Sequence, residues 1–134
     1  IQAFSQTIQL LDGEMAAEAR YQIAYMYYLK RDMNLARELS NKASYENSGY
    51  PYWVARSIIL LSDILAEQGD LFNAEAALSA IIESYSDDED ILREAQEKRA
   101  RILELMNRSS RMDTTGDGGR FLDMQEDDQG GSDQ

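Results

Sequence analysis

The side chains that could do chemistry in this chain are carboxylates, lysines and tyrosines, because its 134 residues include no histidine and no cysteine. The missing histidine removes the commonest general base near neutral pH and the commonest transition-metal ligand. The missing cysteine removes thiol nucleophiles, thiolate metal sites and disulfides together. The sequence therefore predicts a protein that is not an enzyme and that holds no metal and no cofactor.

Paired carboxylates are the strongest remaining candidate for acid–base work. Asp63 and Glu67 stand four residues apart, which is one turn of a helix. Acids in this spacing on an exposed face are usually solvated, whereas a strongly raised pKa inside a deep pocket would favour catalysis. An accessory domain of an enzyme or of a carbohydrate-handling complex, using such surface carboxylates, is the alternative to a pure binding function.

Two acidic segments could suggest cation sites. The run Asp87-Asp88-Glu89-Asp90 precedes an apolar-periodic stretch, where acids commonly occupy the positive end of a helix dipole. We expect a capped, solvated helix start there. The segment 113–118 is similar to the opening of a calcium loop, but Met124 stands where a bidentate glutamate is required. We expect no calcium site in that segment.

Charge and hydropathy exclude two classes of partner. The formal net charge is −12, from 13 basic and 25 acidic side chains, and this balance repels phosphates. No run of eighteen apolar residues occurs, so we predict no membrane insertion. Nucleic acid is not an expected partner either.

Helical periodicity and its breaks define the elements. Apolar residues recur at helical spacing and are interrupted by Gly13, by the corner Arg31-Asp32, by the loop 47–51 and by Gly69-Asp70. The predicted helices cover residues 1–11, 14–30, 33–45, 52–68, 71–85 and 88–108. The segment 109–134 is rich in glycine and acids, and we predict a disordered acidic tail.

An internal repeat relates the predicted helix pairs. A shift of 38 residues places Asp32 on Asp70, Ala36 on Ala74 and Ala24 on Ser62. Small residues thus recur where two helices must cross closely. We expect one helical domain over 1–108, made of a half repeat (1–13), two repeats (14–50 and 51–86) and a capping helix (87–108). The half repeat suggests that further repeats precede it in the parent chain.

This pattern resembles the tetratricopeptide repeat family, in which antiparallel helix pairs of about 34 residues stack into a superhelix. Large, small, aromatic, turn and alanine positions follow in order as Ile23-Ala24, Tyr27, Asp32 and Ala36, although Arg31 replaces the turn glycine. The resemblance implies an all-α solenoid fragment that ends in a capping helix. The stretch 15–28 also resembles bacterial cell-envelope members of the family, some of which serve outer-membrane assembly. This favours the periplasm over the cytoplasm.

The resemblance further implies a scaffold that binds a partner protein or peptide in the concave groove lined by the first helix of each pair. The residues that match groove positions are Glu18, Tyr21, Tyr25, Tyr28 and Leu29 in the first repeat, and Arg56, Ile59, Asp63, Ala66 and Glu67 in the second. Ile23, Ala24 and Tyr27 would be core. The tyrosines share one helical face, which could instead pack on an upstream repeat of the parent chain. For Tyr50, Tyr52 and Trp53, core packing is favoured over binding.

Overall fold

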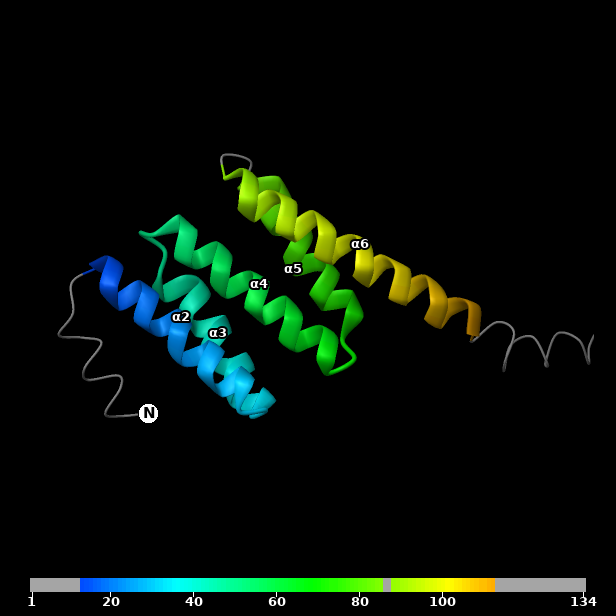
Figure 1. The fold of residues 1–134 in the computed structure, drawn as a ribbon, viewed down its shortest axis with the longest axis horizontal. Coiled ribbons are helices and arrows are strands. Elements are labelled where there is room, and N and C mark those ends of the chain that lie inside the picture. The colour runs from blue at the N-terminus through cyan, green and yellow to red at the C-terminus, as the bar shows by residue number, and fades with distance from the viewer. Residues whose placement is uncertain (1–12, 86–87, 113–134) are drawn as a thin grey trace, which may run out of the picture. The chain divides into compact units, whose positions relative to one another are not determined.

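The computed structural model describes residues 13–85 and 88–112, and within these ranges the ordered elements are all α-helices (Figure 1). They are α2 (Gly13–Leu29), α3 (Met33–Glu46), α4 (Pro51–Glu67), α5 (Leu71–Ser84) and α6 (Glu89–Met112). The predicted all-α class is confirmed for this part of the chain. The half repeat falls almost wholly outside the described residues, as does most of the predicted tail, while α6 runs four residues beyond its expected end.

The corners inside the two helix pairs have the same backbone. Arg31 takes a φ of 67° and Gly69 a φ of 87°, both in the left-handed region that ends helices. The next amide then bonds back into the helix, from Asp32 to the carbonyl of Tyr27 at 3.0 Å and from Asp70 to that of Leu65 at 2.8 Å. Arg31 thus adopts the conformation that Gly69 takes at the equivalent corner, so the two turns are alike although only one contains glycine.

The aspartates that follow these corners start the second helices. Asp32 accepts a hydrogen bond from the amide of Leu35 at 3.3 Å, and Asp70 accepts one from the amide of Asn73 at 3.2 Å. Each carboxylate satisfies an amide that the first turn of a helix leaves without a partner. The two helix pairs related by the 38-residue repeat therefore share the geometry of their corners and caps as well as their sequence pattern.

From α2 to α5, helices that follow one another in the chain pack together, and α2 also contacts α4 (Figure 1). Small residues lie at both crossings within the pairs. Ala24 and Ala36, and their equivalents Ser62 and Ala74, have no exposed surface. The hydroxyl of Ser62 donates to the carbonyl of Ala74 at 3.0 Å, a contact that requires close approach of α4 and α5. Of the other predicted core residues, Tyr27 is half-buried against the same cluster as Ala24.

The chain divides at Ile102 into two compact units, each of which contains part of α6. In the first unit α6 buries Ile91, Ala95 and Ile102. Its start is capped as expected, because Asp88 Oδ1 accepts a hydrogen bond from the amide of Ile91 at 3.1 Å. In the second unit the described residues continue the helix, with an ion pair between Arg108 and Glu104 at 3.7 Å. In neither described range is any helix both long and apolar enough to span a bilayer.

The crossing of α4 and α5 yields a stability prediction. Ala74→Leu should lower the free energy of unfolding by about 1–3 kcal/mol, because the added methylenes must force two packed helices apart. Urea denaturation followed by circular dichroism measures the change. Ala76→Leu is the matched control, since Ala76 lies on the same helix and is exposed. Equal effects of the two substitutions would show that Ala74 is not at a tight crossing.

Candidate partner-binding face

Five aromatic rings form an unbroken line across α2 and the start of α4, which we call the aromatic stripe. Neighbouring ring centroids lie 6.2 Å apart for Tyr28 and Tyr25, 6.0 Å for Tyr25 and Tyr21, 5.7 Å for Tyr21 and Trp53, and 4.9 Å for Trp53 and Tyr52. These separations fall within the range of favourable aromatic pairing. The stripe therefore joins the first helices of two successive repeats.

The stripe has anchored rings and open rings. Tyr21 and Tyr28 are half-buried and pack against the core cluster that contains Ala24. Tyr25 and Tyr52 are 37 % and 47 % exposed. Trp53 is half-buried, and within the described part of the chain its indole nitrogen is enclosed without a hydrogen-bond acceptor. The aromatic surface is therefore held on one side by packing against the core and exposed to solvent on the other.

Glu67 fixes one end of the stripe. The hydroxyl of Tyr28 donates to Glu67 Oε2 at 2.5 Å, and Arg31 Nη2 donates to Glu67 Oε1 at 2.6 Å. The hydrogen bonds from Arg31 and Tyr28 hold the pKa of Glu67 below its ordinary value. The bond to Glu67, together with burial, raises the pKa of Tyr28 to about 12. The end of α2 is thereby joined to the end of α4.

Four charged side chains join α4 to α6. Arg56 lies 2.7 Å from Glu94, and Lys98 donates to both carboxylate oxygens of Asp63 at 2.8 Å. Lys98 also lies 3.9 Å from Glu94, so the four form one network. Burial raises the pKa of Asp63, an effect that Lys98 opposes. Burial alone would lower the pKa of Arg56, but its hydrogen bonds to Glu94 and Tyr21 outweigh this and raise it.

The structure brings six of the predicted partner-binding residues together: Tyr21, Tyr25, Tyr28, Arg56, Asp63 and Glu67. Glu18 and Leu29 are exposed on α2, and Ala66 is half-buried. The assignment of Ile59 to the groove is corrected, because this side chain is only 1 % exposed. An isoleucine at the flank of the helix face gains free energy by leaving water, and neighbouring packing covers it.

Sequence reasoning missed several members of this face. Arg31, Glu94 and Lys98 were not assigned, although Arg56 and Glu94 are opposite charges one repeat length apart and could have been paired on that basis. In the aromatic group at 50–53, for which core packing was favoured, Tyr52 is 47 % exposed and Trp53 is half-buried. Tyr52 and Trp53, for which the sequence favoured core packing over binding, form the far end of the stripe.

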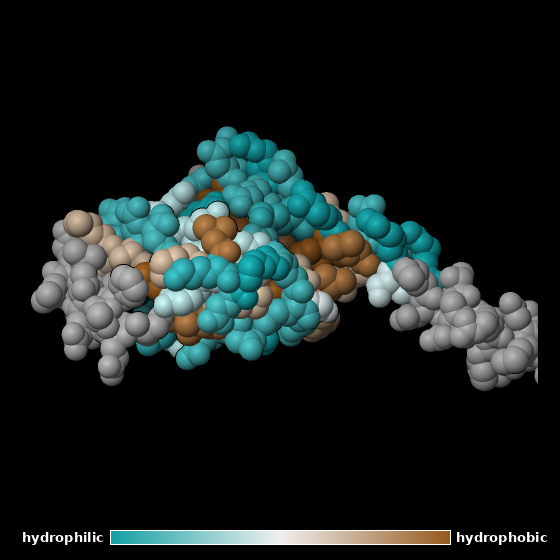
Figure 2. Space-filling view, turned by 60° about the horizontal axis from the view of Figure 1, so that its bottom comes forward, coloured by the Kyte–Doolittle hydropathy of each residue, from teal (hydrophilic) through white to brown (hydrophobic). Residues whose placement is uncertain are grey.

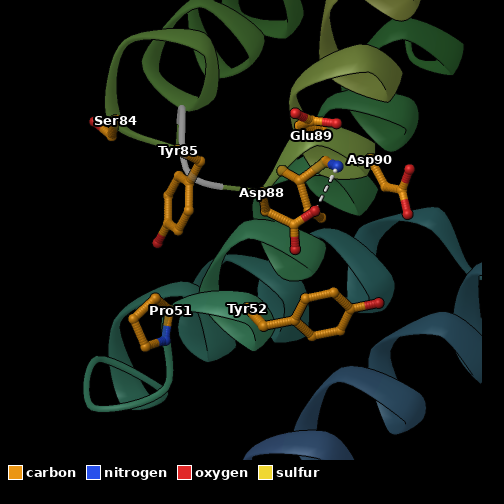
Figure 3. A pocket seen from close by; sticks show the side chains of 8 residues that line it. Pro51, Tyr52, Ser84, Tyr85, Asp88, Glu89 and Asp90 are labelled. Carbon is orange, nitrogen blue, oxygen red and sulfur yellow. Dashed lines mark hydrogen bonds between the residues drawn. The ribbon is translucent and has the colours of Figure 1, made fainter.

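An open pocket of about 700 Å³ adjoins this end of the stripe (Figure 3). Its lining residues are Pro51, Tyr52, Ser84, Tyr85, Asp88, Glu89, Asp90 and Ile91. The two tyrosines border the cavity together with the acidic start of α6. Burial raises the pKa of Tyr85. One carboxylate of the acidic run caps the helix, as the dashed line in Figure 3 shows, and Asp90 pairs with Arg93 at 2.6 Å.

Apolar surface elsewhere is scattered. Met15, Leu29 and Phe72 are the most exposed apolar side chains of α2 and α5 in the described ranges. On the face drawn in Figure 2, hydrophilic side chains separate the apolar patches. The aromatic stripe is the candidate contact surface whose members are joined by ring-to-ring contacts.

No protein-family model, no curated protein and no solved structure matches this chain significantly. What the chain does must therefore be inferred from its own residues and their geometry.

The network between α4 and α6 predicts that substitutions of Lys98 and Asp63 have coupled effects on the free energy of unfolding. Lys98→Met should lower the free energy of unfolding by about 1–2 kcal/mol, because it leaves the half-buried carboxylate of Asp63 beside other acids without its cation. Adding Asp63→Asn should restore part of the loss. A double-mutant cycle in urea measures this coupling. Strictly additive effects would contradict it.

The contacts of Glu67 predict a pH dependence. A carboxylate whose folded pKa is depressed stabilises the fold above its unfolded pKa, and this contribution is lost as the pH falls through the folded value. Glu67→Gln should therefore reduce stability at about pH 7, by less than about 1 kcal/mol because the pair is partly exposed, and reduce it less at about pH 3, where more of the carboxyl group is protonated. Urea unfolding at the two pH values measures this. Glu38→Gln, on the exposed surface of α3, corrects for the loss of one charge.

Proposed function

We propose that the chain is part of a tetratricopeptide-type scaffold and that it binds a partner protein or peptide on the face formed by α2, α4 and the start of α6. The repeated corners, caps and small-residue crossings support the repeat architecture. The first helices of successive pairs contact each other, as stacking of such pairs requires.

The aromatic stripe is the observation that carries this proposal. Tyrosine and tryptophan offer large contact area with a polar tip and few rotatable bonds, and they are enriched among the residues that dominate binding energy. Here Tyr21 and Tyr28 are held by the core, and Tyr28 also by Glu67. A partner that binds such a surface loses little free energy to ordering side chains, because most of them are ordered beforehand.

The state of the paired carboxylates favours binding over catalysis. Asp63 is bound by Lys98, and Glu67 is bound by Arg31 and Tyr28. The pKa of Glu67 is held down by these bonds, and although burial raises the pKa of Asp63, Lys98 occupies both of its carboxylate oxygens, so neither carboxylate is free to accept a proton from a substrate. We therefore extend the proposal to a scaffold without catalytic activity of its own.

Site-specific photo-crosslinking tests the proposal. A photoreactive phenylalanine analogue at Tyr25 should crosslink a discrete partner in cells that express the full chain. The same analogue at Tyr45 is the matched control, because Tyr45 is 62 % exposed but lies on α3, outside the stripe. With the crosslinked partner in hand, Tyr25→Ala should lower its affinity about fivefold or more, as loss of an interface hot spot does, and Tyr45→Ala should not.

Crosslinks from Tyr45 alone would place the partner on the second helices and refute the proposed face. Equal crosslinking from both positions would indicate non-specific contact and would also count against it. Circular dichroism of each variant checks that the helical content is unchanged.

A further inference from the structure

We infer that the segment bound by the aromatic stripe is cationic, with lysine or arginine side chains between apolar ones. This inference rests on the proposed function and adds the chemistry of the partner. It follows from how the charges of α2, α4 and α6 are distributed around the rings.

The basic side chains of α2 and α4 already have partners within the chain. Arg20 is the only basic residue of α2, and it donates to Asn47 at 2.9 Å and lies 3.5 Å from Glu46. Arg56 is the only basic residue of α4, and it is bound to Glu94. A carboxylate on a partner would have to displace one of these internal pairs. The face is therefore poorly suited to an acidic segment.

Two carboxylates without a cation lie on α2 beside the middle ring of the stripe, Tyr21. Glu14 and Glu18 precede Tyr21 by seven and three residues, so helical geometry places them on the same face as the tyrosines. Both are exposed, and no ion pair engages either of them within the described part of the chain. The stripe thus offers negative charge to a partner beside Tyr21.

The Tyr52 end of the stripe is also acidic. Tyr52 borders the pocket that Asp88 and Glu89 line with it (Figure 3). Glu89 is exposed and engages no ion pair in the described ranges. An aromatic surface with unpaired carboxylates beside its middle and at its Tyr52 end, in a chain of net charge −12, is complementary to a basic segment.

The molecule itself contains an example of the contact that we infer. Lys30 Nζ lies over the ring of Tyr27, 5.6 Å from its centroid. Cations bind the faces of aromatic rings electrostatically, and a nearby carboxylate adds to the attraction. The open rings of Tyr25 and Tyr52 can accept partner cations in the same way. Neighbouring rings lie about 5–6 Å apart, so the stripe gives a short segment several rings to contact.

Trp53 provides a direct readout, because it is the only tryptophan of the chain and lies within the stripe. The probe is a peptide of about nine residues in which arginines alternate with leucines and serines. Two comparison peptides carry glutamine or glutamate in place of arginine. Titration into the full chain should change the Trp53 emission, with a Kd for the arginine peptide at least tenfold below that for the glutamine peptide. Binding should weaken as salt is added.

Glu18→Gln should weaken binding of the arginine peptide about threefold or more, because it removes an unpaired carboxylate beside the rings. Glu83→Gln makes the same charge change on α5, where the side chain is exposed and lies outside the stripe. It should leave the Kd unchanged. Equal weakening by both substitutions would mean general attraction to an acidic chain and would overturn the inference.

The remaining outcomes separate this inference from the proposed function. If the glutamine or glutamate peptide binds as tightly as the arginine peptide, or the arginine peptide does not bind, the inferred charge preference is refuted. If binding of any such peptide is then lost in Tyr25→Ala, the aromatic stripe remains the binding face. If a peptide binds and Tyr25→Ala has no effect, both the cationic partner and the proposed face are wrong.

Discussion

Close approach of the two helices in each pair is the constraint on which the rest of the structure depends. Ala24 meets this constraint with Ala36, and Ser62 with Ala74, all without exposed surface. Protein interiors are close-packed, so side chains at such a crossing fix the distance and angle between helices. Ser62 is compatible with this environment because its hydroxyl is satisfied by the carbonyl of Ala74. The corners and caps then recur at equivalent positions of both pairs.

Contacts between successive pairs set the chemistry of the candidate binding face. Exposed ion pairs contribute little stability one by one, but half-buried charges such as Asp63 need a partner because packing has removed part of their hydration. Arg56 and Lys98 are both bound in these ion pairs, so neither cation of the face is left to bind a partner. What is left toward solvent is a line of aromatic rings flanked by acids. The ion pairs that packing of the helices requires thus also decide which charges the candidate binding face presents to a partner.

The features that follow from local sequence were predictable. Helix positions depend on apolar periodicity, and Asp32 and Asp70 cap helices through bonds that span three residues. The small residues recur at a fixed shift, so the close crossings could be expected before any coordinates. The shared face of Tyr21, Tyr25 and Tyr28 follows from helical spacing alone. Each of these depends on residues close together in the chain or on a simple repeat.

Only the tertiary structure decided which side chains on the helix faces are buried and which charged or hydroxyl groups bind one another. Ile59 and Tyr52 lie on one helix, yet one is buried and the other open, because neighbouring helices cover α4 unevenly. Lys98 reaches Asp63 across 35 residues and Tyr28 reaches Glu67 across 39. Sequence alone determined the helices, their corners and their crossing points, because these depend on local bonds and periodicity. Burial and charge pairing are set by side chains distant along the chain, so they were fixed only when the helices packed.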